Sequence, residues 1–180
     1  MKKYFRKLRN IKGFTLIELL VVIGILGILA AALIATIDPF EQLKKGRDSS
    51  TRNTVSEFYN ASIRYYSINS QFPWGSNDIV GAADNSLLDN SAAIGTIIAA
   101  GELKDKFIEL AGTGNLDKMY VTSTAEGTSG IPENISVCYR PESKAFRADA
   151  NSLYDINGEI DANCSDVATR PTSTCYWCMR

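Results

Sequence analysis

The chain is organised around the stretch Gly13-Phe14-Thr15-Leu16-Ile17-Glu18-Leu19-Leu20, which opens an apolar run that continues to Ile37. Leucine, isoleucine, valine, alanine and glycine make up most of the run, and Glu18 is its only charged residue. At about 1.5 Å per residue, a helix over residues 14–37 would be roughly 36 Å long, and the hydrocarbon core of a bilayer is about 30 Å thick. The sequence therefore predicts a helix here that is long enough to cross a membrane.

Charge is distributed unevenly on the two sides of this run. Residues 1–13 hold six of the 19 basic residues and none of the 20 acidic ones, which leaves 13 basic against 20 acidic residues, a net charge of −7, in the rest of the chain. A basic flank before an apolar helix predicts that the leader stays in the cytoplasm and that the C-terminal part is exported. The acidic exported part argues against nucleic-acid binding through bulk charge.

Two ordinary classes of N-terminal segment are alternatives. A secretory signal peptide has an apolar core of about 7–15 residues, followed by a cleavage site with small residues. The run in this chain is longer, and the plausible cut lies before it, so this class is disfavoured. An uncleaved signal anchor is the second alternative, and it stays open.

The segment resembles the N-terminus of type IV pilin precursors and of the related type II secretion pseudopilins. The resemblance rests on a basic leader that ends in Gly13, the aromatic Phe14, the lone Glu18 and the apolar run after it. It covers residues 1–37 closely, whereas the remaining two thirds of the chain match only in general layout.

This resemblance implies a processing step and a set of partners. A prepilin peptidase that is also a methyltransferase would cut between Gly13 and Phe14 and would methylate the new N-terminus at Phe14. Glycine suits a scissile bond that must lie extended in an active site, because it has no side chain to obstruct that site. The family also implies self-assembly into a helical filament, with a platform membrane protein and a cytoplasmic assembly ATPase as partners.

Glu18 acquires a role in assembly from the same resemblance. The corresponding carboxylate in pilins is thought to meet the amino terminus of a neighbouring subunit. Both groups would be buried in an apolar helical bundle, where each offsets the desolvation of the other. The alternative is a glutamate that is tolerated near the headgroups because the dipole of the helix N-terminus favours it.

Pro39 interrupts the helical pattern, because proline lacks a backbone N–H and its ring clashes with the carbonyl four residues earlier. We expect one long helix with a bend at this point and with residues 38–70 as its amphipathic second half. Apolar and aromatic side chains recur there at intervals of three and four, which predicts a face that packs on a sheet. This face contains Val55, Phe58, Tyr59, Ser62, Ile63 and Tyr66.

The rest of the chain predicts a small sheet. Residues 71–119 are expected to connect the helix to the sheet and to include a short helix over 92–100, and residues 120–180 to form an antiparallel sheet and a disulfide-bearing C-terminal region. Strands are expected over 119–123, over 135–140 in a hairpin with 144–148, in a second hairpin around Asn157-Gly158, and near 174–179. The predicted fold class is α+β, a long helix packed on a sheet as in pilins.

All four cysteines lie in the exported part. They are Cys138, Cys164, Cys175 and Cys178. An even count predicts two disulfides, and the sequence does not choose among the three pairings. Cys175 and Cys178 could instead form a redox pair, but only two residues follow them and no βαβ pattern surrounds them. A zinc site built from all four cysteines is disfavoured in an exported chain.

Few other residues in the sequence indicate catalysis or metal binding. The chain has no histidine, and therefore lacks the commonest general base and metal ligand. We expect neither an enzyme nor a cofactor. Calcium is the one metal considered, with Asp155, Asn157 and Asp161 as candidate ligands, although their spacing does not match an EF-hand loop.

The sequence therefore predicts a structural subunit of a type IV pilus-like filament. It would be a single-pass protein of the cytoplasmic membrane before assembly and part of a cell-surface or periplasmic filament afterwards. A type II secretion pseudopilin is the alternative within the same class. An uncleaved, signal-anchored thiol-redox protein that uses Cys175 and Cys178 is the alternative from another class.

Overall fold

The computed structural model describes residues 13–36, 38–75, 86–125, 132–166 and 174–180. The chain divides into two units, Met1–Pro39 and Phe40–Arg180, and each is described by itself. The first contains helix α1 (Leu16–Thr36). The second, called the head below, contains nearly all of helix α2 (Pro39–Asn69) and the elements that follow it.

Helix α1 confirms the predicted apolar helix with slightly narrower bounds. Its segment Leu16–Ile34 is long and apolar enough to cross a membrane. The prediction of one long helix with a bend at Pro39 is not met, because α1 ends at Thr36 and a second helix begins at Pro39. Proline is tolerated in this first helical position, where its missing N–H would have no partner within the helix.

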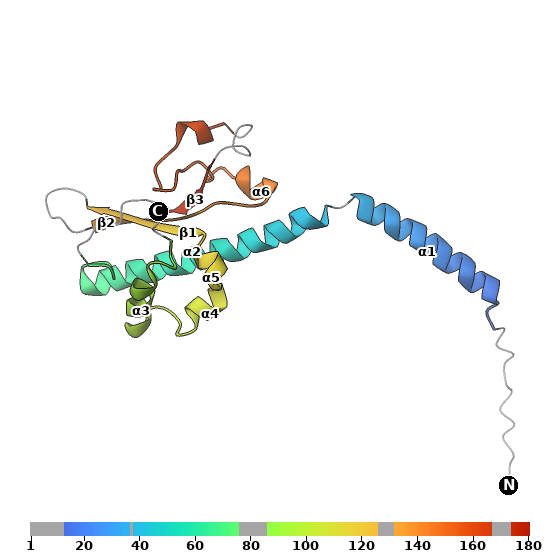
Figure 1. The fold of residues 1–180 in the computed structure, drawn as a ribbon, viewed down its shortest axis with the longest axis horizontal. Helices are drawn as coiled ribbons and strands as arrows, with labels where there is room; N and C mark the ends of the chain where they lie inside the picture. The colour runs from blue at the N-terminus through green and yellow to red at the C-terminus, as the bar shows by residue number, and fades with distance from the viewer. Residues whose placement is uncertain (1–12, 37, 76–85, 126–131, 167–173) are drawn as a thin grey trace, which may run out of the picture. The chain divides into compact units, whose positions relative to one another are not determined.

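The head is built on an antiparallel sheet of three strands in the order β1 (Met119–Ala125), β2 (Pro132–Tyr139) and β3 (Trp177–Met179). Met119 lies opposite Tyr139, which lies opposite Trp177, so these buried side chains share one face of the sheet. Figure 1 shows β1 and β2 lying along α2. The predicted strands near 119–123 and 135–140 are thus confirmed.

The core of the head fills the space between the sheet, α2 and three short helices. These helices are α3 (Ser91–Ala99), α4 (Phe107–Ala111) and α5 (Thr113–Leu116). Helix α3 confirms the short helix expected over 92–100. The predicted face of α2 is confirmed as well, since Val55, Phe58 and Ser62 are buried and Tyr59, Ile63 and Tyr66 pack against the core.

The predicted hairpin between residues 135–140 and 144–148 is wrong. Lys144–Arg147 forms a short helix, α6, and β2 pairs with β1 and β3 instead. The hydroxyl of Ser143 caps α6 by accepting a hydrogen bond from the backbone N–H of Phe146. Arg52 of α2 holds the helix in place, because its guanidinium carbon lies 4.4 Å from the centre of the Phe146 ring.

The second predicted hairpin is present only as a tight turn. Tyr154 and Ile160 form an isolated bridge, and Gly158 has a positive φ of 79°. Asn157 does not have the positive φ that the predicted type I′ turn also requires. No strand forms on either side of it in the described part of this region. The last strand, expected near 174–179, is shortened to Trp177–Met179, although Tyr176 adds a further bridge to Tyr154.

Both predicted disulfides form, and the structure supplies the pairing that the sequence left open. Cys138 bonds to Cys178, its direct neighbour across β2 and β3. Cys164, at the end of the 3₁₀ helix η1 (Ala162–Cys164), bonds to Cys175. Cys175 and Cys178 therefore belong to different disulfides and do not form a redox pair with each other.

Candidate functional site

The segment that precedes α1 is irregular and open to solvent. Gly13, Phe14 and Thr15 are not helical, and α1 begins at Leu16. Phe14 is 86% exposed, and a Cβ atom added to Gly13 would meet no other atom within 4 Å. The Gly13–Phe14 peptide bond thus lies in a segment that a peptidase could bind in an extended conformation without first unwinding a helix.

Thr15 and Glu18 form a reciprocal cap at the start of α1. A carboxylate oxygen of Glu18 accepts hydrogen bonds from the backbone N–H and the hydroxyl of Thr15, both at 2.8 Å. The backbone N–H of Glu18 donates in turn to the Thr15 hydroxyl at 3.3 Å. This is a capping box, which gives partners to N–H groups that the first turn of a helix otherwise leaves unpaired.

The role of Thr15 was not predicted from the sequence, although a signal for it exists. A serine or threonine followed three residues later by glutamate, just before an apolar run, is a known start signal for helices. Thr15-Leu16-Ile17-Glu18 fits that pattern. Glu18 therefore has a local function at the helix start in addition to any function in assembly.

Glu18 lies among exposed apolar side chains at the start of α1. Phe14, Ile17, Val21 and Val22 line a hollow beside it on the helix surface. All four are about half exposed or more. Large apolar surfaces of this kind are covered by lipid or by other protein segments in the functional state.

The other candidate residues form no comparable site. Asp155 accepts hydrogen bonds from the backbone N–H groups of Asn157 and Glu159, both at 2.9 Å, and Asp161 accepts one from that of Asn163. These contacts shape the turn. Within the described ranges, no three His, Cys, Asp or Glu side chains lie close enough together to hold a metal ion. Calcium binding stays an untested prediction.

The comparison with protein families identifies the same N-terminal segment. Residues 8–34 match the family described as the prokaryotic N-terminal methylation motif. This match spans Gly13, Phe14, Thr15 and Glu18 together with most of α1, and it does not reach the head. No curated protein and no solved structure matches the chain.

Proposed function

We propose that this chain, which carries the prokaryotic N-terminal methylation motif, is a type IV pilin-like or pseudopilin precursor that polymerises into a filament through α1. In this proposal it is inserted with residues 1–13 in the cytoplasm, cut between Gly13 and Phe14, and methylated on the new amino group of Phe14. The head then remains outside the cytoplasm on the exposed side of the filament.

The observation that carries the proposal is the combination of an accessible Gly13–Phe14 bond with a completely uncovered apolar helix. The side chains described in α1 are all exposed, and Glu18 is the only charged residue among them. A helix that is apolar on every side requires lipid or other helices around it. Cleavage removes the six leader charges, which would otherwise hold the N-terminus at the cytoplasmic surface.

Assembly gives the Glu18 carboxylate a second partner. In an apolar bundle of helices its charge must be compensated, and the amino group of a cut, neighbouring Phe14 has the opposite charge. Thr15 already binds one carboxylate oxygen of Glu18 and so orients it at the helix start. The other oxygen is the one that we assign to the neighbouring amino group.

The processing step is tested by the mass of the N-terminal peptide. Protein recovered from the cell envelope should yield a peptide that begins at methylated Phe14, and Gly13→Leu should leave the leader attached. Gly24→Ala is the matched control, since this glycine lies inside α1 with open space around it and should not affect cleavage. A wild-type peptide that still carries residues 1–13, with none cut, would contradict the proposal and favour an uncleaved anchor.

The assembly step is tested with Glu18→Gln. Glutamine can replace glutamate in a capping box, so this variant keeps the helix start and removes only the charge. We expect it to be cut and methylated normally but to be depleted from filaments sheared off the cell surface. Unchanged incorporation would show that the charge is dispensable. Wild-type protein that is processed but never appears in the sheared fraction would favour a periplasmic pseudopilus over a surface pilus.

A further inference from the structure

The head has a cavity beside the start of β1 and the end of β2 that the proposed filament role does not use. Its volume is about 350 Å³, within the range of about 300–1,000 Å³ that is usual for small-molecule sites. Its walls come from the start of β1, the loop after β2, helix α6 and the residue before β3. These segments are distant in the sequence, so the folding of the head brings their side chains to one place.

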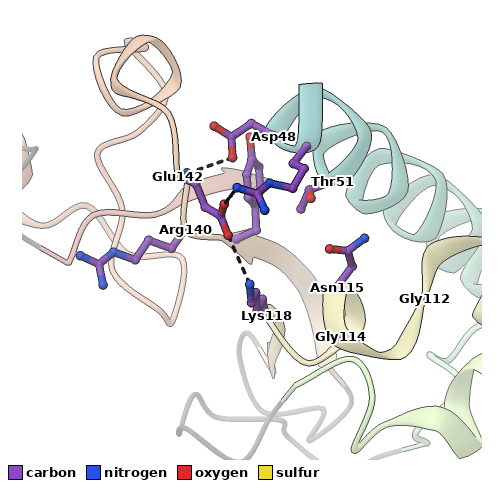
Figure 2. A pocket seen from close by; sticks show the side chains of 10 residues that line it. Asp48, Thr51, Gly112, Gly114, Asn115, Lys118, Arg140 and Glu142 are labelled. Atoms are coloured by element: carbon purple, nitrogen blue, oxygen red, sulfur yellow. Dashed lines mark hydrogen bonds and ion pairs between the residues drawn. The ribbon is translucent and has the colours of Figure 1, made fainter. Parts of the chain in front are cut away.

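Three of the side chains that line this cavity are cationic and one is anionic. The cations are Lys118, Arg140 and Arg147, and the carboxylate is that of Glu142. Glu142 pairs with Lys118 at 3.2 Å. Arg140 takes part in none of the ion pairs among the described residues. Figure 2 shows its side chain extending away from the ion pair between Glu142 and Lys118.

The positive surplus persists when the charges just outside the cavity are counted. Arg47 pairs with Glu142 at 2.9 Å, and the buried carboxylate of Asp48 accepts a hydrogen bond from the backbone N–H of Glu142 and keeps its negative charge. Asp155 is also counted, because its charge acts on the lining residue Tyr176. The total is four cationic against three anionic side chains, in a head with 13 basic and 18 acidic residues. A local surplus of this kind suits an anionic ligand.

Two tyrosines form the aromatic part of the cavity wall. The rings of Tyr120 and Tyr176 meet edge to face, with their centres 5.7 Å apart, an arrangement that aromatic pairs favour. Burial raises the pKa of Tyr176, so its hydroxyl keeps its proton at neutral pH and can donate. The charge of Arg140 acts on the same pKa in the opposite direction, which indicates that the guanidinium lies near this hydroxyl. An anionic oxygen bound there would meet a cation and a neutral donor together.

We propose that this cavity binds a phosphate monoester, with its phosphate oxygens held by Lys118, Arg140 and Arg147 and with the esterified group lying against the tyrosine pair. A phosphate monoester has a charge of about −1.5 to −2 at pH 7, which matches three lining cations offset by one carboxylate. Guanidinium groups bind phosphate through parallel N–H donors, and the Nε of Arg147 already donates to the Pro141 carbonyl at 2.9 Å, which orients this group. The site belongs to the head alone and does not depend on processing or polymerisation.

The probe is phenyl phosphate, titrated by calorimetry into the full chain in a nonionic detergent, at a pH well above the second pKa of the phosphate, which is about 6. Phenyl sulfate is the matched ligand, because it has the same ring and a tetrahedral group with one negative charge fewer. We expect saturable binding of phenyl phosphate, and binding of phenyl sulfate that is about fivefold weaker, the effect of one charge at an exposed site. No saturable binding of phenyl phosphate, or equally tight binding of phenyl sulfate, would overturn the proposal.

The same titration in lipid nanodiscs distinguishes a lipid phosphate from a soluble one. Discs of phosphatidylcholine contain only phosphodiesters, so phenyl phosphate should bind there as it does in detergent. Phosphatidate is a lipid with a phosphate monoester. Competition by phosphatidate in the discs would identify a lipid headgroup as the source of the ligand, and unchanged binding would identify a soluble ester. Loss of phenyl phosphate binding in the phosphatidylcholine discs would contradict the proposal.

Variants with opposite expected effects assign the binding to the cavity. Arg140→Ala removes an exposed cation, so the fold should persist and phenyl phosphate should bind about tenfold more weakly, the loss of one charge-assisted hydrogen bond. Glu142→Gln removes the carboxylate that lines the cavity and should tighten binding about fivefold. Lys106→Ala is the control, because it removes the same charge from an exposed residue that pairs with Glu109 at 3.6 Å outside the cavity. Unchanged binding in Arg140→Ala, or an equal loss in Lys106→Ala, would refute this site.

Discussion

The carboxylate of Asp48 accepts hydrogen bonds from the backbone N–H of Ser143 at 2.8 Å and from its hydroxyl at 2.6 Å, across 95 residues of sequence. It also accepts one from the backbone N–H of Glu142 at 2.9 Å. Asp48 is 2% exposed, and these three donors give its buried charge the partners it needs. The contact therefore ties α2 to the start of α6.

Replacing Asp48 with alanine should destabilise the head strongly. Three donors would lose their acceptor in a buried position, and hydrogen bonds to a charged group are individually worth more than neutral ones. We expect Asp48→Ala to lower the apparent free energy of unfolding by roughly 3 kcal/mol, measured by urea unfolding of the full chain.

A second variant separates charge from hydrogen bonding in this contact. Asp48→Asn keeps one acceptor oxygen and places an amide N–H against donors, so its loss should be smaller than that of the alanine variant but clearly measurable. An alanine variant within about 0.5 kcal/mol of wild type, as for ordinary surface substitutions, would contradict the role assigned to Asp48.

Asp48 also shows where sequence periodicity was informative and where it was not. Asp48, Val55 and Ser62 are spaced by seven residues, so they share one face of α2, and all three are buried. The apolar and aromatic members of this face were predicted, whereas Asp48 was not, because a charged residue in a polar stretch is normally exposed. Its burial depends on donors that lie 94 and 95 residues further along the chain.

The hairpin predicted with residues 144–148 was wrong for a similar reason, since the local pattern does not show the contacts that decide the structure there. Local alternation there is compatible with a strand, but the Ser143 cap and the stacking of Arg52 on Phe146 favour a helix. The disulfide pairing likewise follows from the register of β2 and β3, which no local pattern encodes. By contrast, α1 and the N-terminal methylation motif could be predicted, because their signals lie within one continuous stretch of sequence.

Substitution of Gly158 should destabilise the head more than the same substitution at the other turn glycines. Its φ is 79°, and a Cβ atom at this position would lie 2.5 Å from the Cβ atom of Ser136 on β2. Gly158→Ala should therefore combine the cost of a left-handed backbone, about 1–2 kcal/mol, with the cost of a steric overlap. The measurement is the midpoint of thermal unfolding followed by circular dichroism.

Gly75 provides the matched control for this clash. Its φ of 74° is nearly the same, but an added Cβ would meet nothing within 4 Å. Gly75→Ala should show the backbone cost alone, and adding Ser136→Gly to Gly158→Ala should recover part of the difference. Equal losses at the two glycines would argue against the close approach of the turn to β2.

Glu41 should make the stability of the head depend on acidic pH. The backbone N–H of Lys144 and the ammonium of Lys44, both at 3.0 Å, hold the pKa of Glu41 below its usual value of 4.5. Because the pKa of Glu41 is lower in the folded state, ionised Glu41 stabilises the fold. This stabilisation is present above pH 4.5 and is lost as pH falls through the folded-state pKa.

Unfolding measured at a series of pH values checks this dependence. Glu41→Gln should be less stable than wild type at neutral pH, and the difference should shrink below pH 4.5, where wild type also becomes protonated. Lys44→Met should have a smaller effect, since the hydrogen bond from Lys144, the larger cause of the shift, remains. A difference between wild type and Glu41→Gln that does not change with pH would rule out this assignment.

The two disulfides should contribute unequally to stability. Cys138–Cys178 closes a loop of 40 residues and Cys164–Cys175 one of 11 residues. Chain entropy alone gives about 4 kcal/mol for the longer loop and about 3 kcal/mol for the shorter one. The longer loop also fixes β3, a strand of three residues that pairs only with β2 in the described sheet.

Paired substitution of Cys138 and Cys178 by alanine should therefore lower the apparent free energy of unfolding more than the same change at Cys164 and Cys175. The reverse order would mean that the bridge between η1 and the segment before β3 holds the C-terminal region together more than the sheet does.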